Sequence, residues 1–359
     1  MMSLRWRWVF LILFAAAPLL AATIFLQLWG PAGHPLSHDQ LAALRGALSE
    51  QAFLPGAVTY AAITTIHLFA CGGAIVFAGL ILASVPRRLP LAMAGVALAF
   101  LVAMLMLAAA TAEGDIAAYR LTYFAFEELY RGTGVGTALL APGSGLTTLG
   151  LAVYVPAVLG VLAVALTAAA AAGLVGQVYD ASDPDEKEQE ALLCHAHGRI
   201  KRCAYVLSFV LVTSTVAAAL FFQLPAKLAL SDATLACCLD ASGRVLDPAT
   251  PGFDADTARR LATARARVEG FAAELTMFWG AIYTLTLLAA VGLPLLLVRR
   301  KVYDFLDALK PPGRAAAARQ RMLEAGAVSG GGEQIKVLLA FVAPLVSAPV
   351  TSFLQAAVA

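Results

Sequence analysis

The chain has 359 residues, of which 60% are hydrophobic and only 13% are charged, and its formal net charge is +2. Soluble globular domains carry roughly a quarter charged residues, so this composition excludes a soluble domain and indicates a chain that uses lipid as part of its solvent. The nearly balanced charge gives no reason to expect a nucleic-acid partner.

The apolar runs are about 20 residues long, which is the length that an α-helix needs to cross a bilayer. They lack the strict alternation of a membrane β-barrel, so the spans should be helices. We therefore expect an all-α, polytopic membrane protein with six transmembrane helices. The predicted spans are 9–30, 57–84, 89–112, 151–178, 203–224 and 271–298. A cleaved secretory signal is the alternative for the first run, but this run is longer than the usual apolar region of such a signal.

Basic residues near the span ends orient the chain. They are Arg5, Arg7, Arg87, Arg88, Arg199, Lys201, Arg202, Arg299, Arg300 and Lys301. Because cytoplasmic loops carry the excess of Lys and Arg, these residues predict that both termini are cytoplasmic. The arginines at 259, 260, 265 and 267 are the exception, since they fall in an outside loop. A chain rich in Ala and Leu and without Asn suits a bacterial protein, so we expect a multi-pass protein of the bacterial inner membrane.

Three regions follow from this topology. Residues 1–178 form a first membrane region of four spans, with an aromatic interfacial helix and a glycine-rich loop outside at 113–150. Residues 179–310 form a long helical hairpin with a cytosolic stem, spans five and six, and an outside loop at 225–270. Residues 311–359 form a cytosolic tail.

The hairpin begins with a predicted helix start at Ser182-Asp183-Pro184-Asp185, where a capping serine, a proline and acidic side chains suit a helix N-terminus. A helix from Asp183 to Leu224 would be about 60 Å long, twice the hydrocarbon thickness, so half of it should project into the cytosol. The fifth span should end at Pro225. The sixth span should extend likewise, until Pro311-Pro312-Gly313 breaks it.

The tail carries no charge from Val337 to Ala359. Its length would allow a seventh span, but Pro344 and Pro349 argue against one. We expect an amphipathic helix that lies on the membrane or against the cytosolic stem.

Polar side chains within the spans are the candidates for a site. His67, Glu274, Thr64 and Tyr283 could line a polar path through the membrane, because ionisable residues there are functional candidates by default. For His67 alone, an interhelical hydrogen bond is the favoured role. For Glu274, pairing with an outside arginine is favoured.

Cys194 and His197 are the candidate metal ligands, since they share one helix face at a spacing of three residues. No second ligand pair accompanies them, so a solvated face of the stem is the favoured interpretation. The sequence indicates no cofactor.

These features favour a non-enzymatic interaction protein, such as a sensor, a scaffold or an assembly component. Its expected partners are the lipid bilayer and a protein partner or second copy of the chain that binds through the cytosolic stem. A transporter or channel for a small solute or ion is the alternative. A metal-dependent membrane enzyme is the third hypothesis, although common hydrolase motifs such as Gly-x-Ser-x-Gly are absent.

Overall fold

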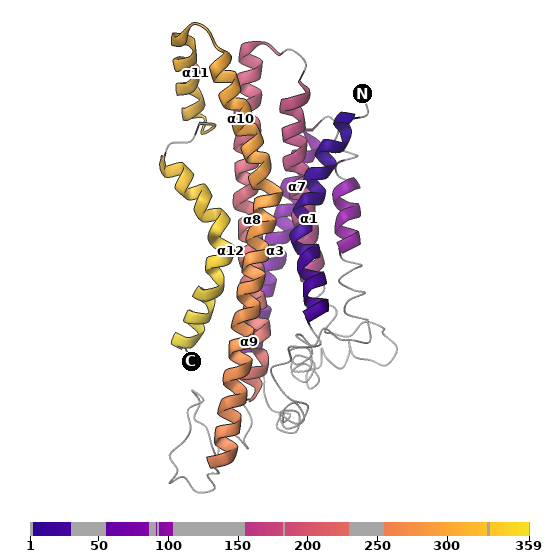
Figure 1. Ribbon diagram of the computed structural model, residues 1–359, viewed down its shortest axis with the longest axis vertical. Coiled ribbons are helices and arrows are strands. Elements are labelled where there is room, and N and C mark those ends of the chain that lie inside the picture. The colour runs from indigo at the N-terminus through magenta and orange to yellow at the C-terminus, as the bar shows by residue number, and fades with distance from the viewer. Residues whose placement is uncertain are drawn as a thin grey trace.

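The computed structural model describes residues 3–29, 55–85, 91, 93–102, 155–181, 184–229, 255–328 and 331–358. These residues form helices and short turns, with no strand among them, so the predicted all-α class is confirmed. The helices are α1 (Ser3–Trp29), α3 (Pro55–Ala83), α7 (Val155–Asp180), α8 (Glu186–Ala229), α9 (Ala255–Leu287), η3 (Leu288–Gly292), α10 (Leu293–Ala308), α11 (Pro312–Glu324) and α12 (Gly331–Val358), with a shorter stretch at 93–102 (Figure 1). The predicted interfacial helix and glycine-rich loop at 113–150 lie outside the described residues.

Four of these helical stretches are long and apolar enough to cross a membrane. They are Thr59–Ala83, Val155–Asp180, Glu186–Gln223 and Glu269–Ala308. Shorter apolar helices occupy Phe10–Ala22, Met93–Val102 and Gln334–Val350. A helical membrane protein is therefore the class to which the chain belongs.

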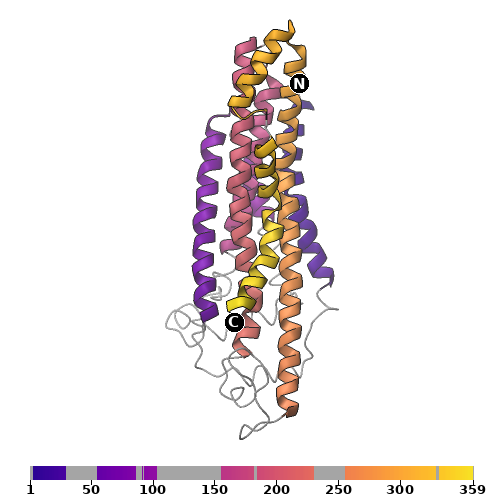
Figure 2. The same cartoon turned by 90° about the vertical axis from the view of Figure 1, so that its left-hand side faces the viewer.

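The helices form an elongated bundle in which successive long helices run in opposite directions (Figures 1 and 2). The N-terminus, the turn between α7 and α8, and the α10–α11 connection lie at one end of the bundle. The first residues of α9 lie at the other end. This alternation places the basic segments of α8 and α10 at the same end as the N-terminus, which we call the basic end.

Small side chains let the helices approach closely in the centre. An alanine-rich stretch of α7, Ala168–Ala172, is completely buried or nearly so. A methyl group added to Gly95 would lie 3.2 Å from the carbonyl oxygen of Ala165 on α7. Close packing of small residues is the usual means of holding membrane helices together, because lipid gives no hydrophobic force between them.

The boundaries of α8 differ from the prediction at both ends. Asp185 caps the helix, since its carboxylate accepts a hydrogen bond of 2.7 Å from the Glu188 N–H; Ser182 lies outside the described residues. At its other end the helix continues past Pro225 to Ala229, although its apolar stretch ends at Gln223, next to the expected end of the fifth span. A proline in the last turn removes only one backbone hydrogen bond, which a helix near its end tolerates.

The α9–α10 helix is longer than predicted. One helix runs from Ala255 through Gly270 and the π-turn η3 to Ala308, so the helix of the span expected at 271–298 begins within the outside loop expected at 225–270. At 1.5 Å per residue this rod measures about 80 Å. It ends before Pro311 and Pro312, as predicted.

The C-terminal helix contacts the long helices over part of its length. α12 packs between α8 and α9 within their apolar stretches (Figure 2). The Ser208 hydroxyl donates to the Ala340 carbonyl at 2.6 Å, and a methyl group on Gly280 would lie 2.9 Å from the Pro344 carbonyl oxygen. Pro344 and Pro349 lie inside this helix without ending it. Neighbouring helices commonly stabilise membrane helices at such prolines.

Candidate functional site

His67 lies buried where α3, α7 and α8 meet. Its Nδ1 is 3.0 Å from the Thr213 hydroxyl oxygen, and its Nε2 is 3.4 Å from the Cys71 sulfur. On α7, the backbone of Gly160 leaves room for the ring, since a methyl group there would come within 3.5 Å of Nε2. The predicted interhelical hydrogen bond of His67 is thus confirmed.

The Thr213 hydroxyl also bonds to the backbone of its own helix. It donates to the Val210 carbonyl at 2.8 Å, and it can accept a hydrogen bond from His67 when Nδ1 carries the ring proton. In that tautomer Nε2 can accept from the Cys71 thiol. A neutral imidazole with both nitrogens satisfied is a closed network, and this arrangement suits a structural link between helices.

The other residues of the expected polar path make no hydrogen bond to His67. Tyr283 on α9 accepts a hydrogen bond of 3.0 Å from the Ser214 hydroxyl on α8, and the exposed Glu274 lies on the surface of α9. The hydroxyl of Thr64 is buried and has no hydrogen-bond partner. No hydrogen bond joins any two of the four path residues, which are His67, Glu274, Thr64 and Tyr283.

The two candidate metal ligands occupy different surroundings. Cys194 is partly buried, whereas His197 is only 2% exposed, so the expectation of a solvated face is wrong for His197. His195, between them, is exposed. Burial raises the pKa of the Cys194 thiol, which disfavours the thiolate that a metal requires. Within the described residues no group of three or more His, Cys, Asp or Glu side chains could hold a metal ion.

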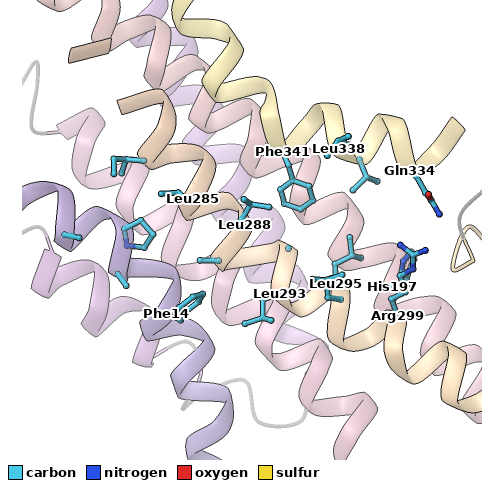
Figure 3. Close-up of a pocket in the computed structure, with 18 residues that line it drawn as sticks. Phe14, His197, Leu285, Leu288, Leu293, Leu295, Arg299, Gln334, Leu338 and Phe341 are labelled. Atoms are coloured by element: carbon cyan, nitrogen blue, oxygen red, sulfur yellow. The ribbon is translucent and has the colours of Figure 1, made fainter. Parts of the chain in front are cut away.

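A groove of about 860 Å³ lies on the side of the bundle. Its floor is the α9–η3–α10 rod, and its two walls are α1 and α12 (Figure 3). It is lined by Phe14, Ala17, Pro18, Ala21, His197, Ile282, Leu285, Leu288, Ala289, Gly292, Leu293, Leu295, Leu296, Arg299, Gln334, Val337, Leu338 and Phe341. The lining is thus almost wholly apolar, and no motif in the sequence indicates it.

The polar residues of the groove are gathered at one end. His197, Arg299 and Gln334 lie together there, while Phe14, Leu285 and Leu288 lie farther along (Figure 3). This is the basic end of the bundle. The groove therefore has an apolar body and a cationic mouth.

A π-turn shapes the floor of the groove. In η3 the Leu293 N–H donates to the carbonyl of Leu288, five residues earlier. Pro294 follows directly, and because it has no N–H it cannot make the α-helical bond to Ala290. Such π-turns recur at functional sites in other proteins. Pro294 lies inside the predicted span 271–298, and this internal proline was the signal in the sequence that could have indicated the irregular turn.

Beyond the groove, at the basic end, α11 folds back on α8 and α10. We call this assembly, residues 186–200 and 298–328, the head. It has its own hydrophobic core, formed by Leu193, Val302, Phe305, Leu306, Ala318, Met322, Ala327 and Val328. The Arg321 guanidinium binds the Glu190 carboxylate through two hydrogen bonds of 2.7 Å each. This bond holds the pKa of Glu190 below its ordinary value.

The chain thus offers three features from which a function can be proposed: the polar contacts of His67, the groove and the head. Comparison with protein families, with curated proteins and with solved structures found no match.

Proposed function

We propose that the chain is a non-enzymatic interaction protein of the membrane, acting as a sensor, a scaffold or an assembly component through its head. One observation carries this proposal: the head has a hydrophobic cluster of its own, which adjoins the core of the bundle at Val178. A segment with its own core keeps its surface in one conformation. A loosely attached tail would have to become ordered when it binds a partner, and the entropy lost would lower its affinity.

The outer face of the head supports binding of a protein partner or a second copy of the chain. Arg314, Arg319 and Glu324 on α11 are exposed, and Leu323 beside them is 44% exposed. Mixed charges around an apolar side chain resemble the composition of transient protein interfaces.

Site-directed photo-crosslinking in native membranes tests this proposal. A photoreactive amino acid at Arg319 should give a discrete adduct, either at twice the mass of the chain or with a partner. The same label at Phe69, which is 79% exposed on the apolar part of α3, serves as the control. Adducts of equal yield at both positions, or none at Arg319, would contradict the proposal.

A transporter or channel for a small solute or ion is the second candidate. It is favoured by the buried Thr64 hydroxyl, which lies one turn from His67 and lacks a partner. Such a hydroxyl could bind a passing solute. In proteoliposomes, solute or ion flux that disappears in the His67→Ala, Glu274→Ala double variant would support a path along these residues, and flux that survives would exclude it.

For the arrangement in the membrane, we propose that the six apolar segments cross the inner membrane of a bacterium, with the basic end in the cytosol. The alternating direction of the helices and the grouping of basic segments support this orientation. We further propose that α12 enters the membrane beside α8 and α9 as a seventh helix.

A further inference from the structure

The groove matches one leaflet of a bilayer in length. Its floor extends from Ile282 to Arg299, which is about 25 Å along a helix. One leaflet, with its hydrocarbon and headgroup regions, measures about 20 Å. The groove therefore has room along its length for an acyl chain and the headgroup that follows it.

Arg299 gives the mouth of the groove its charge. The guanidinium donates to the Tyr303 hydroxyl at 3.3 Å and lies 5.6 Å from the centre of the same ring. Among the described residues no carboxylate forms an ion pair with it, and no Asp or Glu lines the groove. A guanidinium in this position suits a phosphate, which it can bind through two parallel hydrogen bonds.

The floor is deep enough for a chain because its central residues are small. Ala289 and Gly292 line the groove at the π-turn. A methyl group on Gly292 would lie 3.4 Å from side-chain atoms of both Leu288 and Phe341, which is ordinary van der Waals contact, so a side chain larger than a methyl group would press on these two residues. Larger side chains at residues 289 and 292 would occupy the space at the floor of the groove.

We propose that this groove is a binding site for an anionic phospholipid of the leaflet at the basic end. The acyl chain lies along Leu285 and Leu288, and the phosphate binds Arg299. An apolar trough with a cationic mouth is complementary to an amphiphile with an anionic headgroup. A zwitterionic lipid also fills the trough, but the cation of its headgroup offsets the attraction between its phosphate and Arg299, so the site selects by net charge. This inference does not depend on the proposed role of the head.

Lipid titration of the delipidated full-length protein, followed by native mass spectrometry, tests the proposal. The probes are dioleoylphosphatidylglycerol, which is anionic, and dioleoylphosphatidylcholine, which has no net charge. We expect the first to bind about tenfold more tightly, the preference expected of one charge-assisted contact. In Arg299→Gln the affinity for the anionic lipid should fall to that for phosphatidylcholine.

Arg300→Gln is the matched control, because Arg300 is the next residue, is exposed and does not line the groove. It should keep the preference for the anionic lipid. Equal binding of the two lipids by the wild-type protein, or equal losses in the two variants, would overturn the proposal. Displacement of the lipid by soluble glycerol phosphate at the same concentration would overturn it as well, since the site would then bind the phosphate alone. Each variant is first checked for a single peak in size-exclusion chromatography and an unchanged Tm.

Photo-crosslinking locates the acyl chain independently of these variants. Phosphatidylglycerol with a diazirine in its acyl chain should label Leu285 and Leu288 more than Phe69 and Leu80, which are 79% and 67% exposed on α3. Equal labelling at the two places would mean that the lipid forms only a general shell around the bundle, and the groove would not be a site.

Discussion

At the scale of single residues, His67 connects α3 to α8 through the Thr213 hydroxyl. Interhelical hydrogen bonds of this kind contribute about 0.6 kcal/mol on average and at most about 1.7 kcal/mol. In a double-mutant cycle with His67→Ala and Thr213→Val we expect a coupling energy in this range. The measurement is unfolding in mild detergent, and a coupling energy of zero would show that the bond does not stabilise the bundle.

Gly280 determines how closely α12 approaches α9. In Gly280→Ala the new methyl group would lie 2.9 Å from the backbone oxygen of Pro344, so α12 must move away. Overpacking of this kind typically costs about 1–3 kcal/mol. We expect a lower Tm and faster proteolysis of the C-terminal helix.

Gly79→Ala on α3 is the control for this substitution, because a methyl group there would meet no atom within 4 Å. It should leave the Tm unchanged or raise it slightly, since alanine favours a helix more than glycine does. If both variants behaved alike, the close contact between Gly280 and Pro344 would not be the cause of the loss.

At the scale of elements, α11 is attached to α8 by two kinds of contact with different pH dependence. The buried core around Met322 does not titrate, whereas the Glu190 carboxylate does. Since Arg321 lowers the pKa of Glu190 in the folded state, the ion pair stabilises the head above the ordinary pKa of about 4.5. This contribution is lost as the pH falls through the lowered value.

We therefore expect Glu190→Gln to destabilise the head by about 1 kcal/mol or less near pH 6, and by less as the pH falls below 4.5. Met322→Ala should cost about 2–5 kcal/mol at either pH, because Met322 is fully buried and the variant leaves a cavity. Limited proteolysis between α11 and α12 measures both effects. A loss in Glu190→Gln that does not change with pH would contradict the assigned ion pair.

At the scale of the whole molecule, periodicity and charge were enough to predict the helical class, the hairpin and its stop before Pro311. The groove could not be predicted from the sequence, because its floor and walls come from helices that are far apart in the chain. Nothing near Pro344 in the sequence indicates that its backbone would pack against Gly280. Likewise, nothing near Arg299 indicates that α1 and α12 would lie on either side of the groove. Local propensity treats Pro344 as a helix stop, whereas packing against α9 keeps α12 continuous.

The position of α12 changes what the whole chain should look like in a membrane. From Val337 to Val358 the helix has no charged residue and is about 33 Å long, enough to cross the hydrocarbon region of about 30 Å. It also runs away from the basic end of the bundle (Figure 1). We therefore expect the C-terminus to lie on the side opposite the N-terminus, although charge alone predicted that both would be cytosolic. Alkaline phosphatase, which folds only in the periplasm, should be active when fused after Ala359 and inactive when fused after Lys310. Green fluorescent protein should give the reverse pattern, and fluorescence after Ala359 would mean that α12 does not cross the membrane.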